Sequence, residues 1–311
     1  MLPHLPGESD GILALKDQKR LEKGAGVDYK EKSYGTILVD FEEGVLRITN
    51  NLPEQRNPLT VEWMAEFRSV LNQAAVDPEV RVLVITGAGQ AFSAGGNIRE
   101  YAREPGERTE AHPLNRPLWN IPTMSAEERL QKQPMSGKEI ISELADFPKP
   151  TIAAINGTAS GAGFDLSLAC DLRYVADNAQ LIASAVRIGL IPTDGSLWFL
   201  SRIVGMTRAY EILYTGNPVS GMDAERIGLA NKVLPPDELV PYTMTIAKKL
   251  ANGPTIAYQL MKHLMRQSLF MDLPEALEKY YSTQEILFNS SDHKEAVKAF
   301  LERRDANLKG V

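Results

Sequence analysis

Two glycine-rich turns, each preceded by an apolar strand-like run, constrain the fold more than any other feature of this sequence. The first turn follows VRVLVITG and continues as AGQAFSAGGN, ending at Asn97. The second follows PTIAAI and continues as NGTASGAG, ending at Gly163. Continuous β-branched runs are typical of strands that are buried on both faces of a sheet. Strands that lead through such turns into helices indicate an α/β fold.

Other segments extend this pattern. Alternating apolar residues around a turn at residues 42–44 predict a β-hairpin over residues 37–48. Apolar residues recur with a helical period over residues 58–75, which predicts a helix. LRYVA and NKVLP are two further candidate strands. From about Pro241 onward the pattern is helical throughout.

We therefore divide the chain into three parts. Residues 1–33, polar and without a period, are expected to form an extended or partly disordered arm. Residues 34–240 form the α/β core, and residues 241–311 form a C-terminal helical segment. Within the core, residues 101–137 are polar, proline-broken and long for a connection. Such an insertion is either a lid over a site or an inert surface loop, and its place directly after the first glycine turn slightly favours the lid.

Charge and cysteine content exclude several classes of protein. The 311 residues carry 34 Lys and Arg against 40 Asp and Glu, so there is no basic excess for nucleic acid. Cys170 is the only cysteine, which rules out an intramolecular disulfide and, among apolar neighbours, predicts a buried thiol. The histidines show no metal-ligand spacing. Because no run reaches the ~20 apolar residues of a membrane span and the polar N-terminus lacks a secretory core, we expect no membrane partner and a cytoplasmic location.

A helix that starts in a glycine turn can bind an anion. Its first N–H groups have no partner within the helix and carry partial positive charge, and small residues let a ligand approach them closely. Two such turns that converge would direct two N–H donors at one oxygen, which is an oxyanion hole. Tight packing of strand on helix is the structural alternative for either turn alone. Dinucleotide binding is disfavoured because neither turn has the G-x-G-x-x-G spacing.

Five blocks of the sequence, taken in order, resemble the crotonase (enoyl-CoA hydratase/isomerase) superfamily. They are AFSAGGNIRE, PTIAAINGTASGAGFDLSLACDLRYVADNAQ, IGLIPTDGSLWFLSRIVG, AERIGLANKVLP and SSDHKEAVKAFLERR. The likeness runs from about Tyr34 to Arg304. It implies an α/β spiral of ββα units with a C-terminal helical segment, assembled as a homotrimer or a dimer of trimers. The implied partner is an acyl-CoA thioester, with coenzyme A as part of the substrate and no prosthetic group.

The resemblance also implies roles for individual residues. The N–H groups of Ala94 and Ala162 match the two oxyanion donors of the family. Arg56, in the loop 55–59, is a candidate contact for a phosphate of coenzyme A, and a plain exposed arginine is the equal alternative. The adenine and phosphate end of coenzyme A is expected beside this loop and the first glycine turn, at Ala94, Gly95, Gly96 and Asn97.

The acids of the site depart from the family pattern. Of the family's two catalytic glutamates, the first matches Asp165, and the position of the second, twenty residues further on, holds Ala185. One carboxylate beside an oxyanion hole can take a proton from one carbon and return it to another. We therefore expect isomerisation of a double bond rather than hydration. Asp194 is a second candidate acid, with a helix N-cap as its alternative, and His112 in the insertion is a weaker candidate base.

Two other kinds of function stay open. A lyase, hydratase, ring-forming enzyme or C–C bond hydrolase acting on a cyclic or unusual acyl-CoA needs the same hole with differently placed acids. A homologue that binds acyl-CoA without turnover belongs to another class, and saturable binding without any product would identify it. The C-terminal helices carry more apolar residues than one amphipathic face needs, which predicts burial against a neighbouring subunit; these residues are Ile256, Leu260, Leu264, Phe270, Leu273, Phe288 and Phe300.

Overall fold

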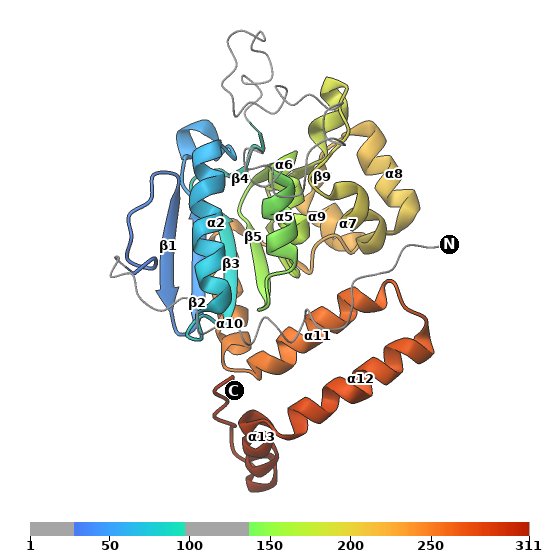
Figure 1. Cartoon of the computed structure of the whole chain (residues 1–311). Coiled ribbons are helices and arrows are strands. Elements are labelled where there is room, and N and C mark those ends of the chain that lie inside the picture. Colours follow the sequence, from blue (N-terminus) through green and yellow to red (C-terminus); the bar gives the residue numbers. More distant parts are fainter. Residues whose placement is uncertain (1–27, 97–136, 311) are drawn as a thin grey trace, which may run out of the picture.

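The computed structural model describes residues 28–96 and 137–310, which form an α/β body around two β-sheets (Figure 1). The six-stranded sheet has the order β1-β2-β3-β5-β7-β10, with strands Ile37–Glu42, Val45–Asn50, Val82–Gly87, Thr151–Ile155, Leu172–Ala176 and Lys232–Leu234. The four-stranded sheet has the order β4-β6-β8-β9, with strands Ala91–Ser93, Thr158–Ser160, Gln180–Ile182 and Val219–Ser220. The predicted hairpin and every strand predicted from an apolar run are confirmed.

Successive strands along the chain pass from one sheet to the other. β3 leads to β4, β5 leads to β6, and β7 leads to β8, with a helix after β6 and another after β8. Within each sheet these strands pair in parallel. The repeat confirms the predicted α/β spiral of ββα units. The strands of the smaller sheet were not predicted, because two or three residues are too few to show an alternating pattern.

Helices pack against the sheets and against one another. α2 (Val61–Val76) begins where the Thr60 hydroxyl accepts the N–H of Trp63, and α5 (Gly137–Ala145) contacts both α2 and α6. α6 (Ala162–Ala169) starts at the second glycine turn and is buried from Gly163 to its end, because it is apolar nearly all round. The segment after β8 continues as η6 (Ser184–Ile188), α7 (Ser196–Ile203), α8 (Gly205–Thr215) and α9 (Gly221–Arg226).

The predicted boundary between core and C-terminal helical segment, at residues 240 and 241, falls inside one helix. α10 (Pro236–Ala251) contains Pro241 and buries Leu239, Thr243 and Ala247, on a helix that contacts β2, β3, β5 and β7. The boundary predicted at residue 240 is therefore wrong, because α10 is part of the core. Pro241 costs a single helical hydrogen bond, which the packing of the buried face offsets. α11 (Thr255–Ser268), α12 (Leu273–Phe288) and α13 (Ser291–Glu302) follow beyond the sheets (Figure 1).

The last three helices expose large apolar side chains. Six of these side chains are 69–83% exposed: Met265, Phe270, Leu273, Tyr281, Phe300 and Leu301. Many large apolar side chains exposed on one group of helices are typical of a protein that buries them against a partner. The threefold assembly itself stays a prediction.

The end of the N-terminal arm is fixed to the core. The Tyr29 hydroxyl donates to Asp77 at the end of α2, and Lys30 forms an ion pair with the same carboxylate at 2.8 Å. Residues 28–33 of the predicted arm are without helix or strand and are packed on the core. Residues 1–27 and nearly all of the insertion at 101–137 lie outside the described residues. Cys170 is buried, as predicted, and no helix of the described part is long and apolar enough to cross a bilayer.

Candidate active site

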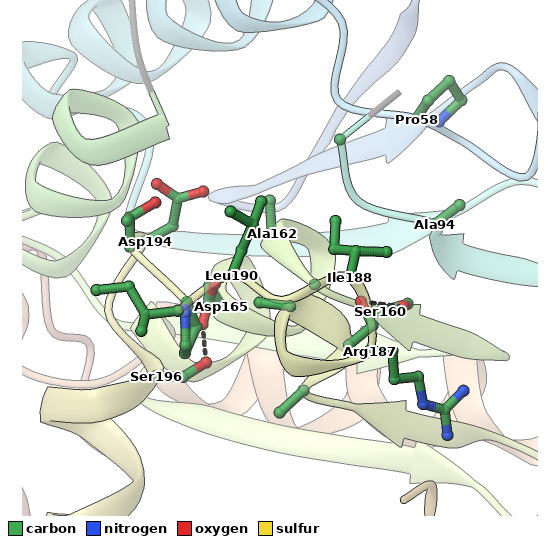
Figure 2. Close-up of a pocket in the computed structure, with 18 of the residues that line it drawn as sticks. Pro58, Ala94, Ser160, Ala162, Asp165, Arg187, Ile188, Leu190, Asp194 and Ser196 are labelled. Atoms are coloured by element: carbon green, nitrogen blue, oxygen red, sulfur yellow. Dashed lines mark hydrogen bonds between the residues drawn. The ribbon is translucent and has the colours of Figure 1, made fainter. Parts of the chain in front are cut away.

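A pocket of about 750 Å³ lies where the two glycine turns meet the segment from Ala183 to Ser196. The loop before Pro58 also lines this pocket. Figure 2 shows Asp165, Asp194 and Ser196 on one side of it, with Ala94 and Pro58 across from them. The pocket brings together most of the residues that the sequence singled out: Arg56, Ala94, Gly96, Ala162, Asp165, Ala185 and Asp194.

The two glycine turns are in direct contact. A Cβ added to Gly95 would lie 2.4 Å from the carbonyl oxygen of Ser160 and 3.1 Å from the backbone nitrogen of Ala162. A Cβ added to Gly163 would lie 2.6 Å from the side chain of Ser93. Only residues without a side chain permit this approach, and Gly95 also has a left-handed φ of 83°. The convergence that an oxyanion hole requires is therefore present.

The predicted role of Ala94 as an oxyanion donor is wrong. Its N–H donates to the carbonyl oxygen of Arg56 at 2.8 Å, so this donor is already used. Arg56 presents that oxygen because its backbone is left-handed, with a φ of 60°. Ala162 is the first residue of α6, and no side chain caps this helix start. Among the hydrogen bonds of the described residues, neither the N–H of Ala162 nor that of Gly96 donates to an acceptor.

Asp165 is a buried carboxyl group at the start of α6, only 2% exposed. Its carboxylate accepts hydrogen bonds from the hydroxyl and the backbone N–H of Ser196, the first residue of α7. Burial raises the pKa of Asp165 to about 8, and the charge of Asp194 adds to the rise against the opposing effect of the Ser196 N–H. Asp165 therefore holds the start of α7 and is also a titratable group at the pocket.

Asp194 is not a helix cap. The residue that precedes α7 is Gly195, with a φ of 114° and no side-chain capping bond, so the capping alternative is wrong. Asp194 lines the pocket instead. Burial is the main cause that raises its pKa, the charge of Glu139 on α5 adds to the rise, and a hydrogen bond from the Thr193 hydroxyl opposes both.

The η6 side of the pocket has no acid from Ser184 to Ile188. Ala185 lines the pocket there, at the position where the family resemblance implies a second glutamate. The hydroxyl of Ser160 donates to that of Ser184 at 3.0 Å (Figure 2). Ile188, Leu190 and Ile191 continue the lining with apolar side chains.

Several contributors to the site were not predicted. Asn57 is 1% exposed, and its side chain accepts the N–H of Leu52 and donates to the carbonyl oxygens of Ala88 and Ala91. It thereby fixes the loop that carries Arg56 to the first glycine turn. Ser196 and Arg187 also line the pocket and were missed. Ser196 lies inside the block IGLIPTDGSLWFLSRIVG, and Arg187 directly precedes that block. Of the predicted site residues, Asn97 and His112 lie outside the described residues.

Comparison with known proteins agrees with this geometry. A family model described as enoyl-CoA hydratase/isomerase matches residues 40–124 and 119–310. The chain is 31% identical to a crotonyl-CoA hydratase of Syntrophomonas wolfei, over 89% of this chain and 98% of that protein. It is 30% identical to a 1,2-epoxyphenylacetyl-CoA isomerase of Escherichia coli, over 88% of this chain and 98% of that protein. A crystal structure of an enoyl-CoA hydratase from Bacillus anthracis superposes with a TM-score of 0.77 at 31% identity, covering 89% of this chain and 100% of that one.

Proposed function

The chain belongs to the enoyl-CoA hydratase/isomerase family, and from that premise we propose that its pocket moves a double bond along the acyl chain of an acyl-CoA thioester. One observation carries the choice of isomerisation. Asp165 and Asp194 line the pocket together, whereas Ala185 supplies no carboxylate on the η6 side. Hydration needs one group that activates water and another that delivers a proton. Isomerisation needs a single group, which removes a proton from one carbon and returns it to another.

The oxyanion hole in this proposal consists of the N–H groups of Ala162 and Gly96. Both residues line the pocket, and the absence of a side chain at Gly95 lets the first turn approach the Ala162 nitrogen. The thioester oxygen accepts from both donors and takes the negative charge of the enolate. The start of α6 adds its partial positive charge to that stabilisation.

Asp165 carries the proton. Its carboxylate removes a proton from a carbon conjugated to the thioester, and the electron pair of that C–H bond moves toward the thioester oxygen. The carboxylic acid then returns the proton to a different carbon as the carbonyl re-forms, so no water enters the product. With a pKa of about 8, Asp165 is about one-tenth ionised at pH 7, and its basic fraction rises with pH.

The coenzyme A end of the substrate lies along the exposed edge of the pocket. Arg56 and Arg187 are exposed there and line the same cavity. Guanidinium groups bind phosphate through charge-assisted hydrogen bonds, so we assign the phosphates of coenzyme A to this edge. Replacement of either arginine by alanine should raise KM for acyl-CoA esters with little change in kcat.

Hydration is the second candidate, because relatives of this chain include proteins named as hydratases. The Ser160–Ser184 hydroxyl pair could hold a water molecule beside Ala185, but a serine hydroxyl without an adjacent base does not activate it.

Enoyl-, dienoyl- and cyclic β-oxo-acyl-CoA esters, each incubated in deuterated water and analysed by mass spectrometry, separate these functions. Isomerisation gives a shifted double bond and deuterium only at exchangeable carbons. A product that has gained the elements of water identifies a hydratase, and saturable binding without any product identifies a non-catalytic homologue.

A further inference from the structure

Gly137, at the start of α5, lies against the carboxylate of Asp194. A Cβ added to Gly137 would be 2.8 Å from the carboxylate carbon and 2.8 Å from each of its two oxygens. Such a separation is closer than van der Waals contact allows. The carboxylate can therefore occupy its present place only if residue 137 has no side chain.

Space, rather than backbone conformation, accounts for a glycine at this position. Gly137 is not among the glycines with positive φ, so an alanine could adopt its backbone angles. Glycine also lowers the stability of a helix relative to alanine. The backbone of α5 does not require a glycine here, and the helix would be more stable without it. The space that the Asp194 carboxylate needs explains why residue 137 is a glycine.

We infer that Gly137 is a positioning residue, which lets the first turn of α5 seat the Asp194 carboxylate where it acts on Asp165. The inference rests on the proposed function, because it assigns Asp194 a part in the same proton transfer. α5 and α6 are in contact, so the start of α5 lies beside the helix that carries Asp165. The partial positive charge of a helix N-terminus favours a carboxylate in this place.

Burial is the main cause that raises the pKa of Asp194. Glu139 in the first turn of α5 raises it further, and the hydroxyl of the neighbouring Thr193 lowers it. Asp165, on α6, is the other ionisable group, and its own pKa is raised by the charge of Asp194. A side chain at position 137 displaces the Asp194 carboxylate, which ends a short and rotatable side chain, and leaves the packing of the helices in place.

The decisive variant is Gly137→Ala. We expect an unfolding temperature equal to or above that of the wild type, since alanine favours the helix. We expect the acid limb of the kcat profile to move to lower pH by about one unit, kcat at pH 7 to change by about tenfold or less, and KM to stay unchanged. Lys138→Ala, at an exposed position in the same turn, is the matched control and should change none of these quantities.

Two further measurements keep the inference independent of the reaction. The pKa of Asp165, followed by carboxyl-selective ¹³C NMR, should be lower in Gly137→Ala than in wild type. An equal pKa in both proteins overturns the inference, whatever reaction the enzyme catalyses. A wild type that isomerises no thioester overturns the proposed function, while the NMR titration still decides the role of Gly137.

The second measurement uses the Asp194→Ala background, in which the crowded carboxylate is gone. There Gly137→Ala should cause no additional change in kcat or in the pKa of Asp165, because the two positions act through one contact. If Gly137→Ala changes kcat equally in both backgrounds, residue 137 acts on the fold and not through Asp194.

Discussion

The two sides of the pocket differ in the chemistry they can supply. On the side of α6 and α7, Asp165 is buried, Asp194 is half-buried, and both have raised pKa values. On the η6 side, Ala185 and the Ser160–Ser184 hydroxyl pair offer no carboxyl group. A site whose acids all lie on one side can move a proton between carbons, but it has no carboxylate on the η6 side that could activate a water molecule there. The predictions below test this difference between the two sides.

The largest expected effect comes from Asp165→Asn. Removal of a general base typically lowers turnover by about 10²-fold or more, while asparagine keeps an oxygen that accepts from Ser196. Acyl-CoA affinity, measured by calorimetry with a non-reactive thioester, should stay unchanged. Normal turnover in this variant, together with an inactive Asp194→Asn, would transfer the proton-carrying role to Asp194.

An acid introduced on the η6 side should give both sides of the pocket a carboxylate. Wild-type hydration of crotonyl-CoA should be feeble, because Ala185 cannot activate water. Ala185→Glu should raise that hydration rate by about tenfold or more, measured as loss of the enoyl thioester absorbance. Ala185→Gln has nearly the same size without a charge and should show no gain. Rapid hydration of crotonyl-CoA by the wild type contradicts the assignment.

Asp194→Asn tests how the two acids influence each other. Asp165 must be ionised to act as a base, so kcat/KM should rise with pH through its pKa, which lies near 8. Loss of the negative charge of Asp194 lowers that pKa, so the rise should move to lower pH, and the rate at pH 7 should change by about tenfold or less. The profile from about pH 5 to about pH 10 measures this shift. An unmoved profile would show that the two carboxylates do not interact.

The sequence predicted those parts of the site that depend on local signals. The strand, the glycine turn and the helix start around Ala162 follow from local signals, and the family resemblance then singled out Ala162 and Asp165, both of which line the pocket. Ala94 was misassigned because its N–H is used by the carbonyl oxygen of Arg56, a contact that depends on a left-handed loop far earlier in the chain. The contact between Gly137 and Asp194 also joins distant segments, and no periodicity within either segment indicates it.

The smallest expected effect concerns folding stability. The carboxyl group of Asp165 titrates near pH 4 in an unfolded chain but at about 8 in the folded protein. Between these values the folded state keeps a proton that the unfolded state releases, so the free energy of unfolding decreases as pH rises and levels off above the folded pKa. Asp165→Asn has no such proton to keep, so its free energy of unfolding should not depend on pH through residue 165. The free energy of unfolding of the variant minus that of the wild type should therefore increase from pH 6 to pH 7, by up to about 1.4 kcal/mol.

Urea unfolding at both pH values, followed by circular dichroism, measures that difference between the two proteins. Asp171→Asn serves as a control for the loss of a carboxylate elsewhere, because Asp171 is 34% exposed at its side chain and is paired with Lys262 at 2.9 Å. If the stability of Asp165→Asn relative to wild type is the same at both pH values, Asp165 is already ionised in the folded protein near neutral pH. The side of the pocket formed by α6 and α7 would then carry a permanent negative charge near neutral pH. The expected rise in rate as Asp165 ionises would not occur in that range.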